Sequence, residues 1–242
     1  MFLFPKTTST LTSDLDRMGF DTLATKPLSD FFQGTSAADI FDGGSGSDTV
    51  SYHTSTAAIG VNLLDTASEK GGYAARDQLI SIENIIGSEF NDTITGAPTN
   101  GGRLIMDGGS GNDTLKVGAL FGTSQITTGS GNDLVEIDIT GSNFKVVIKD
   151  FNPYWETAGN AVTTAEALNG DRLDIDFTNL TGLSLNAVSA HQRIIDGDDL
   201  ILRFTNSNVQ GDIVFEDLGQ RVDLVGGVFR IDMGFISGIE AV

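Results

Sequence analysis

Apolar and polar residues alternate in several short stretches of the chain. Val135, Ile137 and Ile139 alternate with Glu136 and Asp138, and this period of two residues predicts a half-buried β-strand. Further short apolar stretches predict strands over residues 145–151, 200–204, 212–215 and 228–233. The spacing of the last three is typical of antiparallel hairpins. The pattern therefore predicts an all-β protein.

Two glycine-rich turns between such stretches share one pattern. Residues 42–50 read Asp-Gly-Gly-Ser-Gly-Ser-Asp-Thr-Val, and residues 107–115 read Asp-Gly-Gly-Ser-Gly-Asn-Asp-Thr-Leu. Glycine lets the backbone adopt a positive φ and turn its carbonyl groups inward, and the aspartate adds a charged oxygen. Because an all-oxygen shell suits a hard cation, both stretches are interpreted as calcium-binding turns.

Degenerate copies of the same turn occur at residues 34–41, 87–94 and 129–134. Any one of them could be an ordinary Gly-Asp turn, but five copies in one chain indicate a repeat. The candidate calcium-binding residues are the glycines and aspartates of these turns: Gly34, Asp39, Gly43, Gly44, Gly46, Asp48, Gly87, Asp92, Gly108, Gly109, Gly111, Asp113, Gly129, Gly131 and Asp133.

The nonapeptide Gly-Gly-x-Gly-x-Asp-x-U-x, where U is apolar, is the repeat of RTX (repeats-in-toxin) proteins, with hemolysin-type repeats, and the chain resembles this family. The resemblance implies a parallel β-roll or β-helix with Ca²⁺ in its turns. Residues 148–153 followed by 170–175 also resemble the element that closes RTX rolls. In that element the resemblance implies that Asp150 and Asp171 bind calcium, although an insertion over residues 154–169 separates its two halves.

The spacing of the aspartates predicts how the coils stack. Nine residues separate Asp39 from Asp48, which places their turns on opposite sides of one coil. The steps from Asp92 to Asp113 and from Asp113 to Asp133 are 21 and 20 residues, close to two nonapeptides. These three aspartates are therefore expected to stack on one side. The turns opposite them lack aspartate, so one ladder of calcium turns is expected there.

A longer inserted coil, common in RTX chains, is expected between these two groups of turns. Residues 52–63 and 77–87 resemble such a coil, with Ile82 and Ile85 pointing into the core. The connecting loop from residue 65 to residue 76 is expected to be solvated.

Three regions follow from this organisation. Residues 1–30 are expected to form an N-terminal arm or cap, residues 31–140 the RTX β-roll, and residues 141–242 a β-rich capping and type I secretion-signal region. The chain opens without a secretory signal pattern and contains no apolar run of membrane-spanning length. RTX proteins are typically exported by type I secretion machinery through a C-terminal signal. The expected location is therefore extracellular, either secreted or at the cell surface.

Charge and composition narrow the function classes. The chain has 33 acidic and 14 basic residues and a net charge of −19, which argues against a nucleic-acid partner. Cysteine is absent, which excludes disulfides and thiolate metal sites. The two histidines, His53 and His191, do not form a zinc motif, and no nucleophile motif is present, so catalysis is not expected.

Two uses of a calcium-folded roll remain open. The first is a structural, adhesion or self-assembling surface or matrix protein, present as a homo-oligomer, layer or filament. The second is a polysaccharide-binding or folding-helper module that accompanies a secreted enzyme. Phe151, Tyr154 and Trp155 motivate the second use, because aromatic side chains on a loop can stack on sugar rings or anchor a partner.

Overall fold

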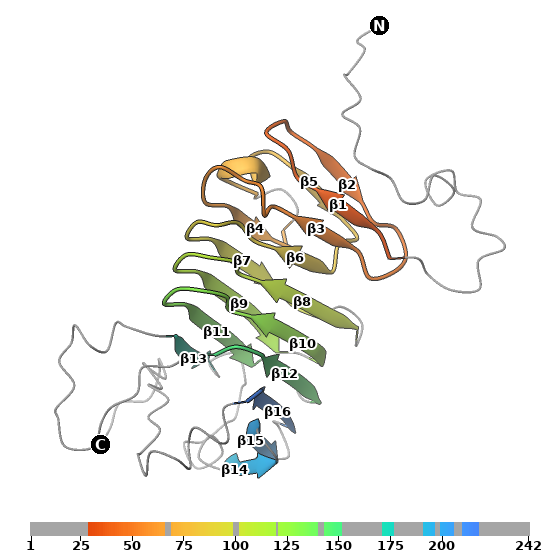
Figure 1. Cartoon of the computed structure of the whole chain (residues 1–242). Coiled ribbons are helices and arrows are strands. Elements are labelled where there is room, and N and C mark those ends of the chain that lie inside the picture. Colours follow the sequence, from red (N-terminus) through yellow and green to blue (C-terminus); the bar gives the residue numbers. More distant parts are fainter. Residues whose placement is uncertain are drawn as a thin grey trace, which may run out of the picture.

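A computed structural model describes residues 29–65, 69–98, 102–119, 121–139, 143–151, 171–176, 191–196, 199–205 and 210–217. The expected strand at 228–233, the insertion at 154–169 and most of the N-terminal arm lie outside these described residues. Within them the chain winds between two layers of short strands to form a β-roll, as expected (Figure 1).

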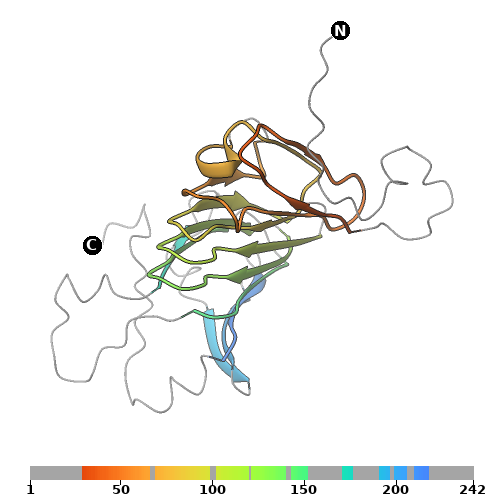
Figure 2. The ribbon, with the colours of Figure 1, turned by 45° about the horizontal axis from the view of Figure 1, so that its top comes forward.

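The longer sheet contains nine strands in the order β1 (Phe31–Gln33), β3 (Thr49–Ser51), β6 (Asn84–Ile86), β8 (Arg103–Asp107), β10 (Gly122–Thr127), β12 (Phe144–Ile148), β16 (Gln210–Phe215), β15 (Asp199–Thr205) and β14 (His191–Asp196). The second sheet contains β13 (Arg172–Asp176), β11 (Leu134–Ile139), β9 (Thr114–Ala119), β7 (Thr93–Gly96) and β4 (Gly60–Asn62). A two-stranded sheet pairs β2 (Ile40–Asp42) with β5 (Gln78–Ile80). Figure 2 shows the successive coils lying one above the next.

Stacked apolar columns hold the coils together. In the longer sheet the parallel register aligns Val50, Ile85, Met106, Ile126 and Ile148, and each of these side chains is fully buried. A matching column in the second sheet aligns Ile94, Leu115 and Val135. Because side chains alternate across a strand, one residue of each neighbouring pair faces this core and the other faces outward. Each coil therefore contributes a small, repeated part of one continuous core.

The coil between β3 and β6 is wider than the others, as the resemblance implied. It passes through β4, a short 3₁₀ turn (Gly72–Ala74) and β5 before it returns to the longer sheet. Ile82 and Ile85 are buried, which confirms their expected orientation.

The prediction that the loop of this wide coil is solvated was wrong in two places. The side chain of Glu69 is only 6% exposed, and Ala74 is fully buried. The cause is a pair of main-chain hydrogen bonds between Lys70 and Gly60, at 2.6 and 2.8 Å, which fold the segment back onto the roll.

The roll ends in a change of strand direction. β16 pairs in parallel with β12 on one side and antiparallel with β15 on the other, and β15 continues antiparallel to β14. The predicted hairpin of residues 200–204 and 212–215 is thus confirmed, whereas β14 was not predicted. Val147, Ile201 and Val214 form a separate small apolar cluster at this end. No helix within the described ranges is long and apolar enough to span a membrane.

Candidate functional site

The candidate calcium-binding turns lie at the corners of the roll, where the chain passes from one layer to the next. The turn at 34–39 leaves the longer sheet after β1, and the turn at 43–48 returns to it before β3. This arrangement confirms that Asp39 and Asp48 lie on opposite sides of one coil. The turns at 87–92, 108–113 and 128–133 each lead from the longer sheet to the second sheet.

A ladder of hydrogen bonds joins the aspartates of successive coils. The main-chain N–H of Asp92 donates to Asp113 Oδ1 at 2.7 Å, and the N–H of Asp113 donates to Asp133 Oδ1 at 2.8 Å. The N–H of Asp133 donates in turn to Asp171 Oδ1 at 3.0 Å. The predicted stacking of Asp92, Asp113 and Asp133 is confirmed, and Asp171 extends it by one coil.

Two shorter ladders were not predicted from the sequence. Asp77 Oδ1 accepts a hydrogen bond from the N–H of Asp39 at 2.8 Å. On the opposite side, Asp48 Oδ1 accepts from the N–H of Asp30 at 2.7 Å, and Glu83 Oε2 accepts from the N–H of Asp48 at 2.9 Å. Asp77 and Glu83 immediately precede stacked segments, as the repeat aspartates do. That position is the only signal that could have identified them.

The two Gly-Gly turns and the turn at 128–133 share an unusual backbone. Their second and fourth residues are glycines with positive φ: Gly44 at 73°, Gly46 at 154°, Gly109 at 95°, Gly111 at 120°, Gly129 at 93° and Gly131 at 150°. Residues with a side chain rarely adopt these angles, which explains the glycines.

Glycine is also required at these turns because oxygen atoms approach the backbone closely. A Cβ atom at Gly108 would lie 2.5 Å from Asp113 Oδ2 and 2.5 Å from the carbonyl oxygen of Thr128. A Cβ atom at Gly87 would lie 2.7 Å from Asp92 Oδ2 and 3.1 Å from the carbonyl oxygen of Asp107. Each glycine thus leaves a space that is lined by carboxylate and carbonyl oxygens.

Two carboxylate oxygens in this ladder lack a hydrogen-bond donor among the described residues. Oδ2 of Asp113 and Oδ2 of Asp133 are buried and accept no hydrogen bond from any residue that the structure describes. Burial, and then the neighbouring carboxylates, raise the pKa of each group from its ordinary 3.8 to about 7. A buried, charged carboxylate with one oxygen that accepts no hydrogen bond destabilises the fold unless a cation neutralises it.

This donor set fits calcium. Ca²⁺ binds six to eight oxygens from carboxylates and backbone carbonyls, which are the groups that line these turns. No cluster of three or more acidic or histidine side chains within the described ranges could hold a metal ion. Backbone carbonyls would therefore have to supply most of the ligands of an ion held in such a turn. A bound ion would supply the positive charge that the buried carboxylates lack.

The turns at 34–39 and 87–92 are built differently. Asp39 Oδ2 accepts hydrogen bonds from the N–H and the hydroxyl of Thr35, at 3.1 and 2.7 Å. Asp92 accepts from the N–H and the hydroxyl of Ser88, at 2.5 and 2.8 Å. In both turns the aspartate is thus bound by the second residue of its own turn.

The predicted end site is assembled around Thr128. Asp150 Oδ1 accepts from the N–H and the hydroxyl of Thr128, at 2.6 and 2.9 Å, and Asp150 Oδ2 accepts from the N–H of Gly129 at 2.9 Å. The hydroxyl of Thr128 also lies 3.2 Å from Asp171 Oδ2. The structure therefore brings Asp150 and Asp171 together despite the insertion between them.

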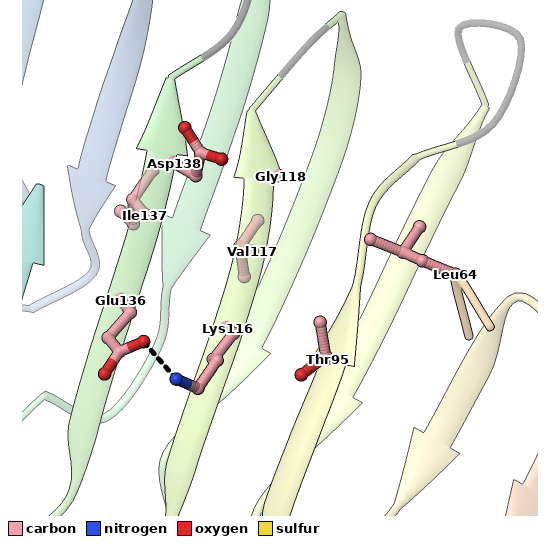
Figure 3. A pocket seen from close by; sticks show the side chains of 8 residues that line it. All are labelled: Leu64, Thr95, Lys116, Val117, Gly118, Glu136, Ile137 and Asp138. Carbon is pink, nitrogen blue, oxygen red and sulfur yellow. Dashed lines mark ion pairs between the residues drawn. The ribbon is translucent and has the colours of Figure 1, made fainter. Parts of the chain in front are cut away.

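A shallow groove of about 360 Å³ lies along β7, β9 and β11, away from the turns (Figure 3). The ion pair between Lys116 and Glu136, at 2.6 Å, lies in this groove. Both side chains are substantially exposed, so the pair contributes little to stability. Of the aromatic cluster, Phe151 is buried and packs against Phe215 with ring centres 5.1 Å apart, so it is not available for stacking on a ligand. Tyr154 and Trp155 lie outside the described residues.

Comparison with known families agrees with this geometry. The family model for the RTX calcium-binding nonapeptide repeat matches four copies, within residues 19–52, 81–98 and 105–119. The chain carries RTX calcium-binding repeats. RTX repeats of this kind bind Ca²⁺, and they form a parallel β-roll like the one described above. The turn at 128–133 lies outside the matched residues, yet it continues the RTX ladder in the structure. The chain matches no curated protein.

Proposed function

We propose that this chain is a secreted calcium-binding RTX protein that folds when Ca²⁺ binds outside the cell, after export by type I secretion machinery. This proposal rests on the buried Oδ2 atoms of Asp113 and Asp133, which have no hydrogen-bond donor in the part of the chain that the structure describes. Without a cation, stacked negative charges and the entropy of ordering glycine oppose folding. A cation that binds only the folded form shifts the equilibrium toward it by mass action.

Asp113 has two separate tasks in this mechanism. Its Oδ1 accepts the N–H of the preceding coil, which fixes the carboxylate and sets the register. Its Oδ2 faces the glycine backbone and the carbonyl oxygens, where it would contact the ion. Folding and calcium binding are therefore coupled through the same side chain. Extracellular calcium modules bind at roughly 10⁻⁴–10⁻³ M, which suits a switch between the inside and outside of the cell.

Circular dichroism with calcium and with a chelator tests this coupling. A β-sheet spectrum is expected in calcium, and loss of that spectrum is expected in the chelator. Magnesium is the matched control, because it demands near-octahedral geometry and dehydrates reluctantly. An unchanged β spectrum after chelation would contradict the proposal.

For the folded roll we propose a non-catalytic role as a structural, adhesion or self-assembling surface or matrix protein. Support comes from the end of the roll that begins with β1 and β2. Within the described residues each of these strands pairs on one side only, β1 with β3 and β2 with β5. Phe31 and Ile40 on these strands are 52% and 67% exposed. An exposed strand edge with apolar side chains is a template for pairing with another chain.

Sedimentation of the full chain at increasing concentration, with calcium present, tests this role. Assembly into dimers or larger species is expected. Replacing Ile40 by lysine should reduce it, because charge on an edge strand prevents pairing. Lysine in place of the exposed Phe121, which lies outside β1 and β2, is the matched control. A monomer at all concentrations would contradict self-assembly and leave the calcium-binding proposal intact.

A further inference from the structure

We propose that the hydroxyl groups of Thr35 and Ser88 take the place of calcium at Asp39 and Asp92. Of the five repeat turns, only those at 43–48, 108–113 and 128–133 would then use their aspartate as a calcium ligand. This inference rests on the calcium binding proposed above and deepens it. It states which carboxylates bind the ion, and that the second residue of each turn determines whether its aspartate does so.

The second residue of the turn separates the two classes. In the glycine class this residue is Gly44, Gly109 or Gly129. In the hydroxyl class it is Thr35 or Ser88. The three glycines have φ angles of 73°, 95° and 93°, whereas Thr35 and Ser88 do not have positive φ. The turn backbone therefore follows a different path in each class.

The main-chain N–H of this residue is used differently in the two classes. In the hydroxyl class it donates to the aspartate that ends its own turn, Asp39 or Asp92. In the glycine class it donates elsewhere: the N–H of Gly109 bonds Asp107 Oδ1 at 3.1 Å. Gly44 likewise donates to Asp42 and Gly129 to Asp150. The positive φ thus turns the N–H away from the repeat aspartate.

The carboxylates differ as a result. Asp92 accepts three hydrogen bonds: Oδ2 from the Ser88 N–H, and Oδ1 from the Ser88 hydroxyl and from the Ile59 N–H at 2.8 Å. Asp113 accepts from the Asp92 N–H through Oδ1, while its Oδ2 has no donor among the described residues. A calcium ion at Asp92 would have to displace donors that already satisfy a buried carboxylate. At Asp113 the ion would instead contact an Oδ2 that has no donor among the described residues.

The hydroxyl class therefore consists of turns whose aspartate is satisfied without a metal. One such turn precedes each group of glycine-class turns along the chain, at 34–39 ahead of 43–48 and at 87–92 ahead of 108–113. Each group of calcium turns thus stacks on, or continues from, a corner that is stabilised by the protein alone.

Counting bound calcium tests the inference, with isothermal titration calorimetry and native mass spectrometry on the full chain. Asp92→Asn should leave the number of bound ions unchanged, and Asp113→Asn should lower it by at least one. The double variant S88G/F90G converts residues 87–92 to Gly-Gly-Glu-Gly-Asn-Asp, which is the full repeat, and should add one ion. Ser36→Gly is the matched control, because exposed Ser36 occupies the third position of its turn and its removal should change nothing.

Two results would overturn the inference: an equal loss of ions in Asp92→Asn and Asp113→Asn, or no added ion in a double variant that folds in calcium. Circular dichroism in calcium establishes folding. If the double variant does not fold, the comparison of the two asparagine variants still decides. Failure of the proposed function has a different signature, since the wild-type chain would then bind no calcium at all.

Discussion

The main-chain N–H of Asp113 donates a 2.8 Å hydrogen bond to Oδ1 of Asp133, which lies 20 residues further along the chain. Asp113 in turn accepts the N–H of Asp92, 21 residues before it. Each aspartate is therefore bonded to the coil before it and to the coil after it. The carboxylate of Asp113 bonds the coil before it and its main-chain N–H bonds the coil after it, so a change of the side chain acts on the contact with Asp92.

Asp113→Asn is expected to have opposite effects with and without calcium. The amide removes a buried charge whose Oδ2 has no donor within the described ranges, so the calcium-free chain should become more stable. In calcium the same change should weaken binding by at least the roughly 10–100-fold that loss of an outer-shell metal partner costs. The β-sheet signal that remains as calcium is withdrawn, followed by circular dichroism, and a calcium titration measure the two effects. Destabilisation of equal size in both conditions would contradict a ligand role for Asp113.

The stability of the calcium-free chain should depend on pH in an unusual direction. Burial raises the pKa of Asp113 and Asp133 from 3.8 to about 7 in the folded state. Between these values the folded chain binds more protons than the unfolded chain, so the free energy of unfolding falls as the pH rises. Circular dichroism in a chelator should therefore show a larger remaining β-sheet signal at pH 5 than at pH 8.

Calcium should reverse this trend, because protons and calcium compete for the same carboxylates. The calcium-saturated chain should be more stable at pH 8 than at pH 5. A calcium-free chain whose stability increases steadily with pH would show that these carboxylates are not buried as charges.

Two glycine-to-alanine variants should separate the turns from the rest of the roll. At Gly108 the added Cβ would lie 2.5 Å from both Asp113 Oδ2 and the Thr128 carbonyl oxygen, so calcium binding should be strongly reduced. At Gly60 its nearest neighbours are atoms of Lys70 at 3.6 and 3.7 Å, which is ordinary contact. Gly60→Ala should change the free energy of unfolding by less than about 1 kcal/mol. Calcium titration and urea unfolding of both variants provide the comparison.

Tyr52→Phe should destabilise the first coils. The Tyr52 hydroxyl is fully buried and donates to Asp77 Oδ2 at 2.9 Å, while Asp77 Oδ1 accepts the N–H of Asp39. Without the hydroxyl, Asp77 loses the hydrogen bond to its Oδ2. Burial already raises the pKa of Asp77 to about 6. The expected loss is about 1–3 kcal/mol in the free energy of unfolding.

Denaturant unfolding in calcium measures this loss. Tyr73→Phe is the matched control, because Tyr73 is only partly buried and packs at the margin of the core. Equal effects of the two substitutions would contradict a specific role for the bond between Tyr52 and Asp77.

The sequence was sufficient to predict the stacking of the later coils. Steps of 20 and 21 residues keep Asp92, Asp113 and Asp133 at the same position of each coil. In a parallel roll, residues at the same position of successive coils lie next to each other. The apolar alternation of Val135, Ile137 and Ile139 likewise corresponds to fully buried positions in β11.

The sequence was not sufficient where the coil changes length. Asp77 and Glu83 contact residues 38 and 35 positions earlier, and these separations differ from the steps of 20 and 21 residues in the later coils. The route from β3 to β6 had to be known before their register could be assigned. The buried position of Glu69 depends on the same route. The two classes of turn were visible as Gly-Gly or Thr-Gly against Gly-Thr or Gly-Ser, but their meaning required the hydrogen bonds of Thr35 and Ser88.

The antiparallel pairing of β16 with β15 gives the roll a fixed terminus. A parallel coil leaves an edge onto which an identical coil fits, so tandem duplication of residues 108–127 would insert a new coil without disturbing its neighbours. At β15 and β14 the pairing becomes antiparallel, so the parallel register that stacks one coil on the next is not continued there. The chain can therefore grow in evolution by internal duplication, while its length at one end stays set by this reversal.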